Sequence, residues 1–261
     1  MTAPLLDARN LTRRYRLPRT SLLQPAPVLT AVDNTSFTIR AGETLGVVGE
    51  SGSGKSTIAR MVMAFETPDA GEVLFQGQNL HALSPYELRL QRQKFQMVFQ
   101  DPFGSLDPRR TVGWSIAEPM RAIGADGDTA RRTAEALEQV GLPARDADKY
   151  PHEFSGGQRQ RIAIARAIVT RPALLVADEA VSALDVSVQA QILNLLMDLQ
   201  DDLGLGILFI SHDLAVVASI CDQILVMQHG KPLEAGPAAQ VLRSPAHAYT
   251  QTLLKAAGVS T

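Results

Sequence analysis

The chain alternates short apolar runs with longer stretches in which apolar residues recur at helical spacing. Residues 44–48 form an apolar run of strand length, and residues 58–65 follow as a helix with its apolar residues on one side. Residues 173–177 and 206–210 are continuous apolar runs, as expected for strands buried on both faces of a parallel sheet. This order predicts an α/β protein with a mostly parallel core sheet.

Antiparallel strands are expected around this core. Alternating polar and apolar residues indicate a strand at residues 35–40, and strands are also expected at residues 5–17 and, after a turn, at residues 72–75. The Pro-rich residues 18–27 predict a loop, and residues 223–234 resemble a hairpin. These short strands predict an antiparallel region beside the parallel core.

Residues 111–140 carry helical patterns without intervening strands, so we expect a helical subdomain there. Ser84, followed by proline and by Glu87 at the third helical position, predicts a capping box at the start of an earlier helix. Residues 95–99 are expected to form a strand before the turn-rich residues 101–108. Two further helices are predicted at residues 158–170 and 186–202.

The composition fits one α/β domain with an inserted or appended subdomain, because 45% of the 261 residues are hydrophobic. The formal net charge of -2, with 25 basic and 27 acidic residues and no long block of one sign, gives no support for a nucleic-acid partner. Cys221 is the sole cysteine, which excludes an intramolecular disulfide and indicates a reducing compartment. We expect neither a cleaved signal nor a membrane span, because no window approaches the roughly 20 apolar residues that a span needs.

The most specific chemistry lies between the first buried strand and its helix, where the sequence fits the phosphate-loop pattern G-x4-G-K-[ST]. Glycines let successive N–H groups point at phosphate oxygens, and the new helix adds its positive end. The lysine can reach the β and γ phosphates of ATP, and the first hydroxyl can ligate Mg²⁺. The alternative, a glycine-rich turn with an incidental lysine, is disfavoured by the flanking strand and helix. The predicted nucleotide-binding residues are Gly49, Glu50, Ser51, Gly52, Ser53, Gly54, Lys55, Ser56 and Thr57.

Further sites lie at strand or helix ends downstream of this loop. Together with it they resemble the nucleotide-binding subunit of an ABC transporter over nearly the whole chain. The matching positions are residues 49–57 as Walker A, Gln100 as the Q-loop glutamine, Ser155, Gly156, Gly157 and Gln158 as the signature motif, residues 174–178 as Walker B, Glu179 as the catalytic glutamate, Asp185 as the D-loop aspartate and His212 as the switch histidine.

The resemblance implies a P-loop NTPase (RecA-like) core with a mostly parallel sheet, an antiparallel β subdomain and an inserted α-helical subdomain. All of these would belong to a single ABC ATPase domain over residues 1–261. Its expected parts are the antiparallel β region and phosphate-loop part of the core at residues 5–95, the helical subdomain with the signature motif at 101–160, the remainder of the core at 161–240 and a short C-terminal tail at 241–261.

Each downstream position has a physical rationale and a simpler alternative. Asp178 ends an apolar strand, where its carboxylate can hold Mg²⁺, although aspartate also caps helices. Glu179 can polarise the water that attacks the γ-phosphorus, the alternative being a solvated charge. His212 could hold that water and the γ-phosphate, whereas a histidine after a strand is commonly structural. Gln100 would contact Mg²⁺ or the water, and its alternative is an ordinary polar strand end.

The signature residues begin a helix, where N–H groups and the helix dipole favour an anion, although a plain Ser-capped helix starts in the same way. In this family the motif contacts ATP bound by the other subunit. The resemblance therefore implies an ATPase dimer, either a homodimer or a heterodimer with a second ABC ATPase, in which Asp185 serves communication between the subunits. Tyr15 looks like the aromatic residue that stacks on adenine, although an aromatic at a strand end commonly belongs to the core.

Five segments resemble the ATPases of dipeptide, oligopeptide and nickel importers, namely residues 99–102, 105–109, 150–155, 183–191 and 247–254. The resemblance implies an ATP-hydrolysing subunit, with ATP and Mg²⁺ bound, that powers uptake of peptides or a similar small solute. Its implied partners are integral membrane permease subunits and, indirectly, an extracytoplasmic solute-binding protein. Its implied location is peripheral, on the cytoplasmic side of the inner membrane.

Two alternatives come from other classes. A soluble ABC-type ATPase that acts on DNA or ribosomes usually carries a long coiled-coil insertion, zinc modules or two cassettes, and none of these features occurs in this sequence. A P-loop kinase outside the ABC family would not need the signature residues 155–158. The sequence therefore favours the importer ATPase.

Overall fold

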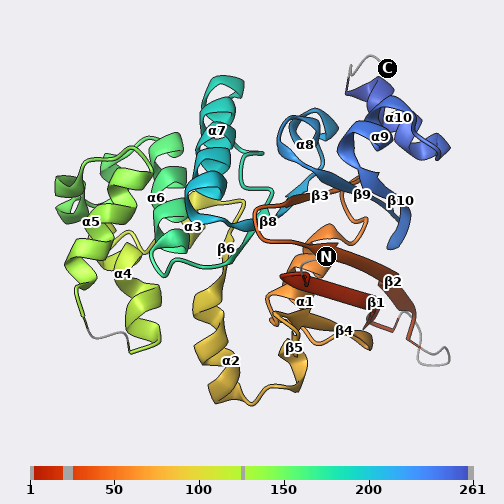
Figure 1. Ribbon diagram of the computed structural model, residues 1–261, viewed down its shortest axis with the longest axis horizontal. Coiled ribbons are helices and arrows are strands. Elements are labelled where there is room, and N and C mark those ends of the chain that lie inside the picture. The colour runs from red at the N-terminus through yellow and green to blue at the C-terminus, as the bar shows by residue number, and fades with distance from the viewer. Residues whose placement is uncertain (1–2, 20–25, 125–126, 258–261) are drawn as a thin grey trace. The chain divides into compact units, whose positions relative to one another are not determined.

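The computed structural model describes residues 3–19, 26–124 and 127–257. These residues divide into two compact units (Figure 1). Unit 1 lies within Met1–Leu83 and Leu208–Thr261, and unit 2 is Ser84–Ile207. Most of the loop predicted at residues 18–27 lies outside the described residues.

Four strands of unit 1 form an antiparallel sheet in the order β2-β1-β4-β5 (Figure 1). Their bounds are Leu6–Arg16 for β1, Val28–Ile39 for β2, Ala70–Phe75 for β4 and Gln78–Asn79 for β5. The three strands predicted in this region are confirmed. β2 begins earlier than predicted, because the β1–β2 pairing contains register shifts that break the strict alternation of polar and apolar residues.

Unit 1 also contains strands in the order β10-β9-β3-β8, where β8 begins in unit 2. Their bounds are Thr44–Val48 for β3, Gly206–Ser211 for β8, Gln223–Gln228 for β9 and Lys231–Pro237 for β10. β3 runs parallel to β9, and all residues of β3 and β8 are buried, which explains their continuous apolar runs. The predicted hairpin is confirmed: β9 and β10 are antiparallel, and His229 and Gly230 take the positive φ angles of a tight turn.

The α-helices in the described part of unit 1 are α1 (Lys55–Val62), α8 (Leu214–Ile220), α9 (Ala238–Arg243) and α10 (Ala248–Ala256). α1 begins before the predicted apolar pattern, because its first turn carries the polar end of the phosphate loop. The other three helices were not predicted. Each has six to nine residues, which is too short for a clear helical period.

A glycine brings α8 close to the strand that precedes the phosphate loop. A Cβ on Gly46 in β3 would lie 2.4 Å from Val217 Cγ1 and 2.7 Å from Cys221 Sγ. Real Cβ atoms do not approach other atoms so closely, so a larger residue would push α8 away. Gly46 thereby fixes α8 against β3.

In unit 2, β6 (Phe95–Val98) runs parallel to β7 (Leu174–Asp178). The α-helices described there are α2 (Pro85–Gln91), α3 (Pro102–Ser105), α4 (Val112–Ala122), α5 (Thr129–Gln139), α6 (Gly156–Ile168) and α7 (Val186–Leu203). The short helix α3 occupies part of the segment predicted as turns, and a proline at its first position favours a helix start. The predicted long helices are confirmed.

Caps and apolar packing define the helices of unit 2. The predicted capping box at α2 is present: the Glu87 N–H donates to Ser84 Oγ at 3.3 Å, and the Ser84 N–H donates to Glu87 Oε2 at 2.9 Å. α4, α5 and α6 pack on one another, with Ile116, Met120 and Leu137 fully buried. These helices lie where the sequence predicts a helical subdomain, and the exact subdomain bounds stay a prediction.

Candidate functional site

Two glycines of the phosphate loop, residues 49–57, are required by close backbone contacts. A Cβ on Gly49 would lie 2.1 Å from the Met227 carbonyl oxygen, and one on Gly54 would lie 2.2 Å from the Ala31 carbonyl oxygen. Gly54 also has a φ of +104°, which side chains disfavour. Only glycine therefore preserves the loop at these two positions, as a phosphate cradle requires.

Lys55 is 4% exposed, and the loop surrounds its ammonium group. Nζ donates hydrogen bonds to the carbonyl oxygens of Gly49 at 2.7 Å and Glu50 at 2.9 Å. The Glu50 carbonyl also accepts a hydrogen bond from the Ser53 N–H at 3.2 Å. The loop thus places a positive charge where water is excluded, and such a charge interacts strongly with an anionic ligand.

The start of α1 adds a second feature suited to anions. Gly54 is the N-cap residue, and as a glycine it supplies no side-chain cap to the helix. Ser56, which is exposed, and Thr57 lie in this first turn. Gly52 lies in open space with a φ of +79°, so its conformation again suits glycine. N–H groups and the helix dipole at this end favour phosphate.

Sequence reasoning missed Tyr249, which contacts the phosphate loop from α10. Its hydroxyl oxygen accepts a hydrogen bond from the Glu50 N–H at 3.1 Å, and its side chain is buried. Burial raises the pKa of the Tyr249 hydroxyl, so the group stays protonated at neutral pH. The sequence of residues 247–254 resembles importer ATPases but does not reveal this contact, because the two residues are 199 positions apart.

Tyr15, the predicted adenine-stacking residue, is half-buried near the end of β1. Its hydroxyl donates a hydrogen bond to Glu66 Oε2, and the Arg13 guanidinium carbon lies 5.0 Å from the ring centroid. The Arg13 contact is a cation–π interaction. These contacts fix the ring, and its stacking on adenine stays a prediction.

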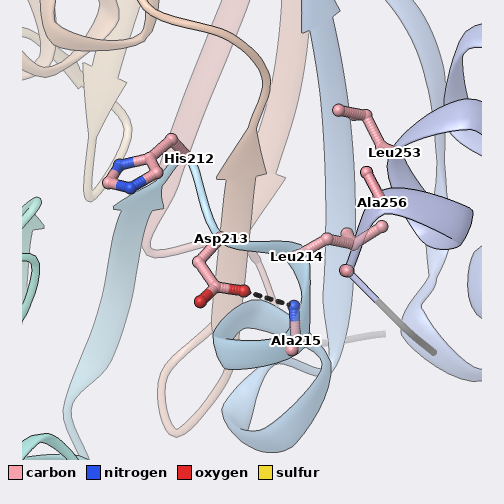
Figure 2. A pocket seen from close by; sticks show the side chains of 7 residues that line it. His212, Asp213, Leu214, Ala215, Leu253 and Ala256 are labelled. Atoms are coloured by element: carbon pink, nitrogen blue, oxygen red, sulfur yellow. Dashed lines mark hydrogen bonds between the residues drawn. The ribbon is translucent and has the colours of Figure 1, made fainter. Parts of the chain in front are cut away.

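His212 follows β8 directly, and its side chain is exposed. The next residue caps α8: Asp213 Oδ1 accepts hydrogen bonds from the N–H groups of Ala215 at 2.8 Å and Val216 at 3.4 Å. Both residues line a pocket of about 400 Å³ together with Leu214 and Ala215. The other lining residues are Leu253 and Ala256 of α10 and Ala257, which follows that helix. Figure 2 shows the His212 ring pointing away from Leu253 and Ala256.

Three predicted site residues of unit 2 follow neighbouring parallel strands. β6 pairs with β7 in the register Val98 to Ala177, so the carboxyl ends of both strands meet at one edge. Asp178 ends β7 and Glu179 follows it, while Gln100 comes two residues after the end of β6 and is exposed. The structure therefore brings these three predicted residues to the same edge of the strand pair.

Glu179 has an unusual backbone conformation. Its φ is +50°, a left-handed value that is uncommon for residues other than glycine. Its carbonyl oxygen accepts hydrogen bonds from the N–H of Ser182 at 3.1 Å and from Ser182 Oγ at 3.0 Å, which hold the turn. Residues kept in such conformations cluster at functional sites, so this observation supports a functional hypothesis for Glu179.

The signature residues begin α6 with a capping box. The Gln158 N–H donates to Ser155 Oγ at 3.3 Å, and the Ser155 N–H donates to Gln158 Oε1 at 2.9 Å. A Cβ on Gly157 would lie 2.5 Å from Val188 Cγ1 in α7, whereas a Cβ on Gly156 would have nothing within 4 Å. Packing within the chain thus explains the glycine at Gly157 and leaves the one at Gly156 unexplained.

Asp185 is the N-cap of α7. Its Oδ1 accepts a hydrogen bond from the Val188 N–H at 2.9 Å. Because Val188 also packs on Gly157, the start of α7 is tied to the signature residues. Val186, the first residue of α7, is 84% exposed. The role of Asp185 in communication between subunits stays a prediction.

Two kinds of feature do not occur among residues 3–19, 26–124 and 127–257. No helix there combines the length and apolar content needed to cross a membrane. Nor do three or more His, Cys, Asp or Glu residues there gather as ligands for a metal ion.

A profile of the family described as "ABC transporter" matches residues 32–182, which is more than half of the chain. The chain belongs to the ABC transporter family. The matched region includes the phosphate loop, the signature residues and Glu179, whereas Tyr15, His212 and Tyr249 lie outside it. The predicted membership is confirmed.

A curated relative is the glutathione import ATP-binding protein GsiA of Escherichia coli (strain K12). It is 50% identical to this chain over 259 residues, which cover 98% of the chain and 42% of GsiA. The protein of the same name from Shigella sonnei (strain Ss046) has the same identity and coverage. The chain therefore spans less than half the length of these relatives.

Solved ABC proteins share the fold. The protein cbiO1 from Clostridium perfringens, part of the ABC transporter complex cbiONQ, has a TM-score of 0.79 at 26% identity, over 92% of this chain and 91% of cbiO1. The ATP-binding cassette MJ0796, in a dimeric post-hydrolysis state with ADP and Pi, has a TM-score of 0.77 at 28% identity, over 89% of this chain and 98% of that one. The predicted α/β P-loop fold is confirmed.

Proposed function

We propose that the chain is the ATP-binding and ATP-hydrolysing subunit of an ABC importer, and that it powers uptake of peptides or a similar small solute through a membrane permease. One observation carries the nucleotide part of this proposal: the glycine loop is closed around the buried ammonium of Lys55. Membership of the ABC transporter family supports it. The importer part rests on likeness to GsiA, which is named as an import protein.

The loop residues fit the phosphates of ATP. Gly49 and Gly54 leave room for close backbone approach, and Lys55 supplies the positive charge. We assign the metal site to Ser56, Gln100 and Asp178, whose oxygen atoms suit Mg²⁺. When bound there, Mg²⁺ would supply positive charge that offsets the negative charge of the phosphates. Because phosphates supply part of its coordination, a cluster of three carboxylates or histidines is not required.

Glu179 is proposed as the general base. Its carboxylate would accept a proton from the attacking water. The hydrogen bonds from Ser182 to the Glu179 carbonyl would fix the backbone from which this side chain extends. His212 would hold the same water in line with the γ-phosphate, and Gln100 would respond to the presence of that phosphate. These residues position water and protons, while ATP supplies the group that is transferred.

The signature residues are proposed to contact ATP held by another subunit. No contact within the chain requires a glycine at Gly156. This observation supports the close approach of a nucleotide from another subunit. The solved cassette MJ0796 is described as a dimer, which supports a dimer here, with itself or with a second ABC ATPase. The implied further partners are permease subunits and, indirectly, a solute-binding protein. The proposed location is the cytoplasmic face of the inner membrane.

The proposed solute class is that of short peptides. GsiA is named for glutathione, which is a tripeptide, and half of the aligned positions are identical. The chain spans 42% of GsiA, so the proposal names the solute class and not glutathione itself.

ATP hydrolysis tests the chemistry directly. We expect Glu179→Gln to lower kcat at least 100-fold, because it removes a general base, while ATP binding persists. Lys55→Ala should weaken ATP binding at least tenfold, because it removes the cation that contacts the phosphates. The measurement is phosphate release together with equilibrium ATP binding. Glu138→Gln and Lys255→Ala, which alter exposed groups, are the matched controls. Normal hydrolysis in both test variants would contradict the roles proposed for Glu179 and Lys55.

Capture from detergent-solubilised native membranes tests the transport part. The Glu179→Gln protein, held with ATP, should retain multi-span permease subunits that mass spectrometry can identify. Recovery of ribosomes or DNA-repair proteins without a permease would leave the ATPase chemistry intact and overturn the importer proposal in favour of a soluble ABC ATPase.

A further inference from the structure

One peptide group of the phosphate loop is held at both ends. The carbonyl oxygen of Gly49 accepts a hydrogen bond from Lys55 Nζ at 2.7 Å, and the N–H of Glu50 donates to the Tyr249 hydroxyl at 3.1 Å. These two groups belong to the same planar peptide unit, so they cannot turn independently. The orientation that gives Tyr249 its partner also aims the Gly49 carbonyl at the Lys55 ammonium.

Tyr249 is held in place beside the phosphate loop, because other contacts fix the start of α10. The two carboxylate oxygens of Glu234 in β10 accept hydrogen bonds from the N–H groups of Ala246 at 2.8 Å and His247 at 3.1 Å. His247 Nδ1 in turn accepts a hydrogen bond from the Tyr249 N–H at 3.1 Å and caps the helix. The tyrosine therefore reaches the loop from a helix whose first turn is anchored to a strand.

The contact comes from a part of the chain that the family profile does not include. The profile match ends at residue 182, whereas Tyr249 is in α10. The same helix contacts α8, the helix that follows His212, and Leu253 and Ala256 line the pocket beside Leu214 (Figure 2). α10 thus touches two segments of unit 1 that carry predicted site residues.

We propose that Tyr249 is a positioning residue for the phosphate loop: its hydroxyl holds the Gly49–Glu50 peptide in the orientation that presents Lys55 to nucleotide phosphates. This inference rests on the proposed nucleotide binding. Without the hydroxyl the peptide can rotate, and the loop spends part of its time in conformations with Lys55 displaced. Apparent affinity falls in proportion to the fraction of loops that remain competent.

The expected effect is a change in nucleotide binding with little change in the chemical step. One hydrogen bond between neutral groups corresponds to about a 2- to 10-fold change in an equilibrium constant. We therefore expect Tyr249→Phe to raise the Kd for ATP and ADP, and the KM for ATP, by about 2- to 10-fold. Once bound, the phosphates themselves order the loop, so kcat should stay within about twofold of wild type.

The test uses the purified full chain. Kd values for ATP and ADP are measured by equilibrium binding, and hydrogen exchange is followed in the nucleotide-free protein at the peptide that contains Glu50. Tyr249→Phe should speed exchange at the Glu50 amide, because that N–H loses its acceptor. Tyr86→Phe is the matched control, since that ring is 69% exposed and lies in α2. It should change neither measurement.

A second variant separates positioning from general stability. Leu254→Ala removes a fully buried side chain of α10 but keeps the Tyr249 hydroxyl. If Leu254→Ala raises Kd as much as Tyr249→Phe, the role of Tyr249 is structural and the proposal is overturned. Unchanged Kd and unchanged Glu50 exchange in Tyr249→Phe would also overturn it. A wild-type chain that binds no nucleotide would instead overturn the proposed function, and the exchange experiment would still report on the contact.

Discussion

The Glu66 carboxylate joins Tyr15 to two arginines in unit 1. The Tyr15 hydroxyl and Arg13 Nε donate to Oε2, and Arg60 Nη1 donates to Oε1 at 3.3 Å. Burial acts to raise the pKa of Glu66, but hydrogen bonds from Tyr15 and Arg13 outweigh it and hold the pKa below its ordinary value of 4.5. Glu66 therefore stays charged at neutral pH and fixes the Tyr15 ring, which the sequence predicts to stack on adenine.

This shift predicts a pH-dependent contribution to stability. The folded pKa of Glu66 lies below the unfolded value, so its stabilisation is fully present above about pH 4.5 and is lost as pH falls through the folded pKa. Glu66→Gln should lower the free energy of unfolding by about 1 kcal/mol at pH 7, and the deficit should shrink as the pH falls below about 4.5. Urea unfolding at pH 7, 5, 4 and 3 measures it. A deficit that is constant across this range, or equal to that of the exposed control Glu138→Gln, would contradict the assignment.

At the scale of elements, the helix that begins with the signature residues contains an unusual buried group. Gln160 in α6 is fully buried, and neither polar atom of its side chain has a hydrogen-bond partner among the described residues. A buried polar group without a partner destabilises a fold by about 1–3 kcal/mol relative to a satisfied one. The element that carries the signature residues therefore includes a position that packing alone would assign to an apolar side chain.

We expect Gln160→Leu to raise the free energy of unfolding by about 1 kcal/mol, because the change removes the unsatisfied amide and keeps a similar volume. The urea midpoint measures the change, with Gln139→Leu at the exposed end of α5 as the control for adding leucine. A lower midpoint for Gln160→Leu would show that the amide is satisfied in solution, and that its polarity stabilises α6.

The elements with strong patterns were predictable from sequence, and the short ones were not. The buried strands β3, β7 and β8 are continuous apolar runs, and α7 has 18 residues with a capping aspartate at its start. The helices α8, α9 and α10 are too short to show a period. The same limit applies to the site: fixed spacing reveals the phosphate loop, whereas the contact of Tyr249 with Glu50 depends on tertiary folding.

At the scale of the whole molecule, the two neighbouring signature glycines differ in their contacts within the chain. Gly157 packs against Val188 of the same chain, so an added methyl group would strain unit 2. Gly156 has open space around it, and as the first residue of α6 it takes an ordinary helical position. A methyl group at Gly156 therefore leaves the chain itself undisturbed and affects only what approaches from outside.

This contrast gives a test of the proposed dimer that separates assembly from folding. With ATP, Glu179→Gln should form a dimer that light scattering after size-exclusion chromatography detects. Adding Gly156→Ala should weaken association at least about fivefold, because the methyl group crowds the approaching nucleotide, while thermal stability and binding of ATP to the chain's own loop stay unchanged. Gly157→Ala, the matched control, should instead lower stability through its clash with Val188. Undiminished dimerisation of the Gly156→Ala, Glu179→Gln protein would show that the signature residues lie outside the dimer interface. The proposed nucleotide site of the single chain would not be affected by that result.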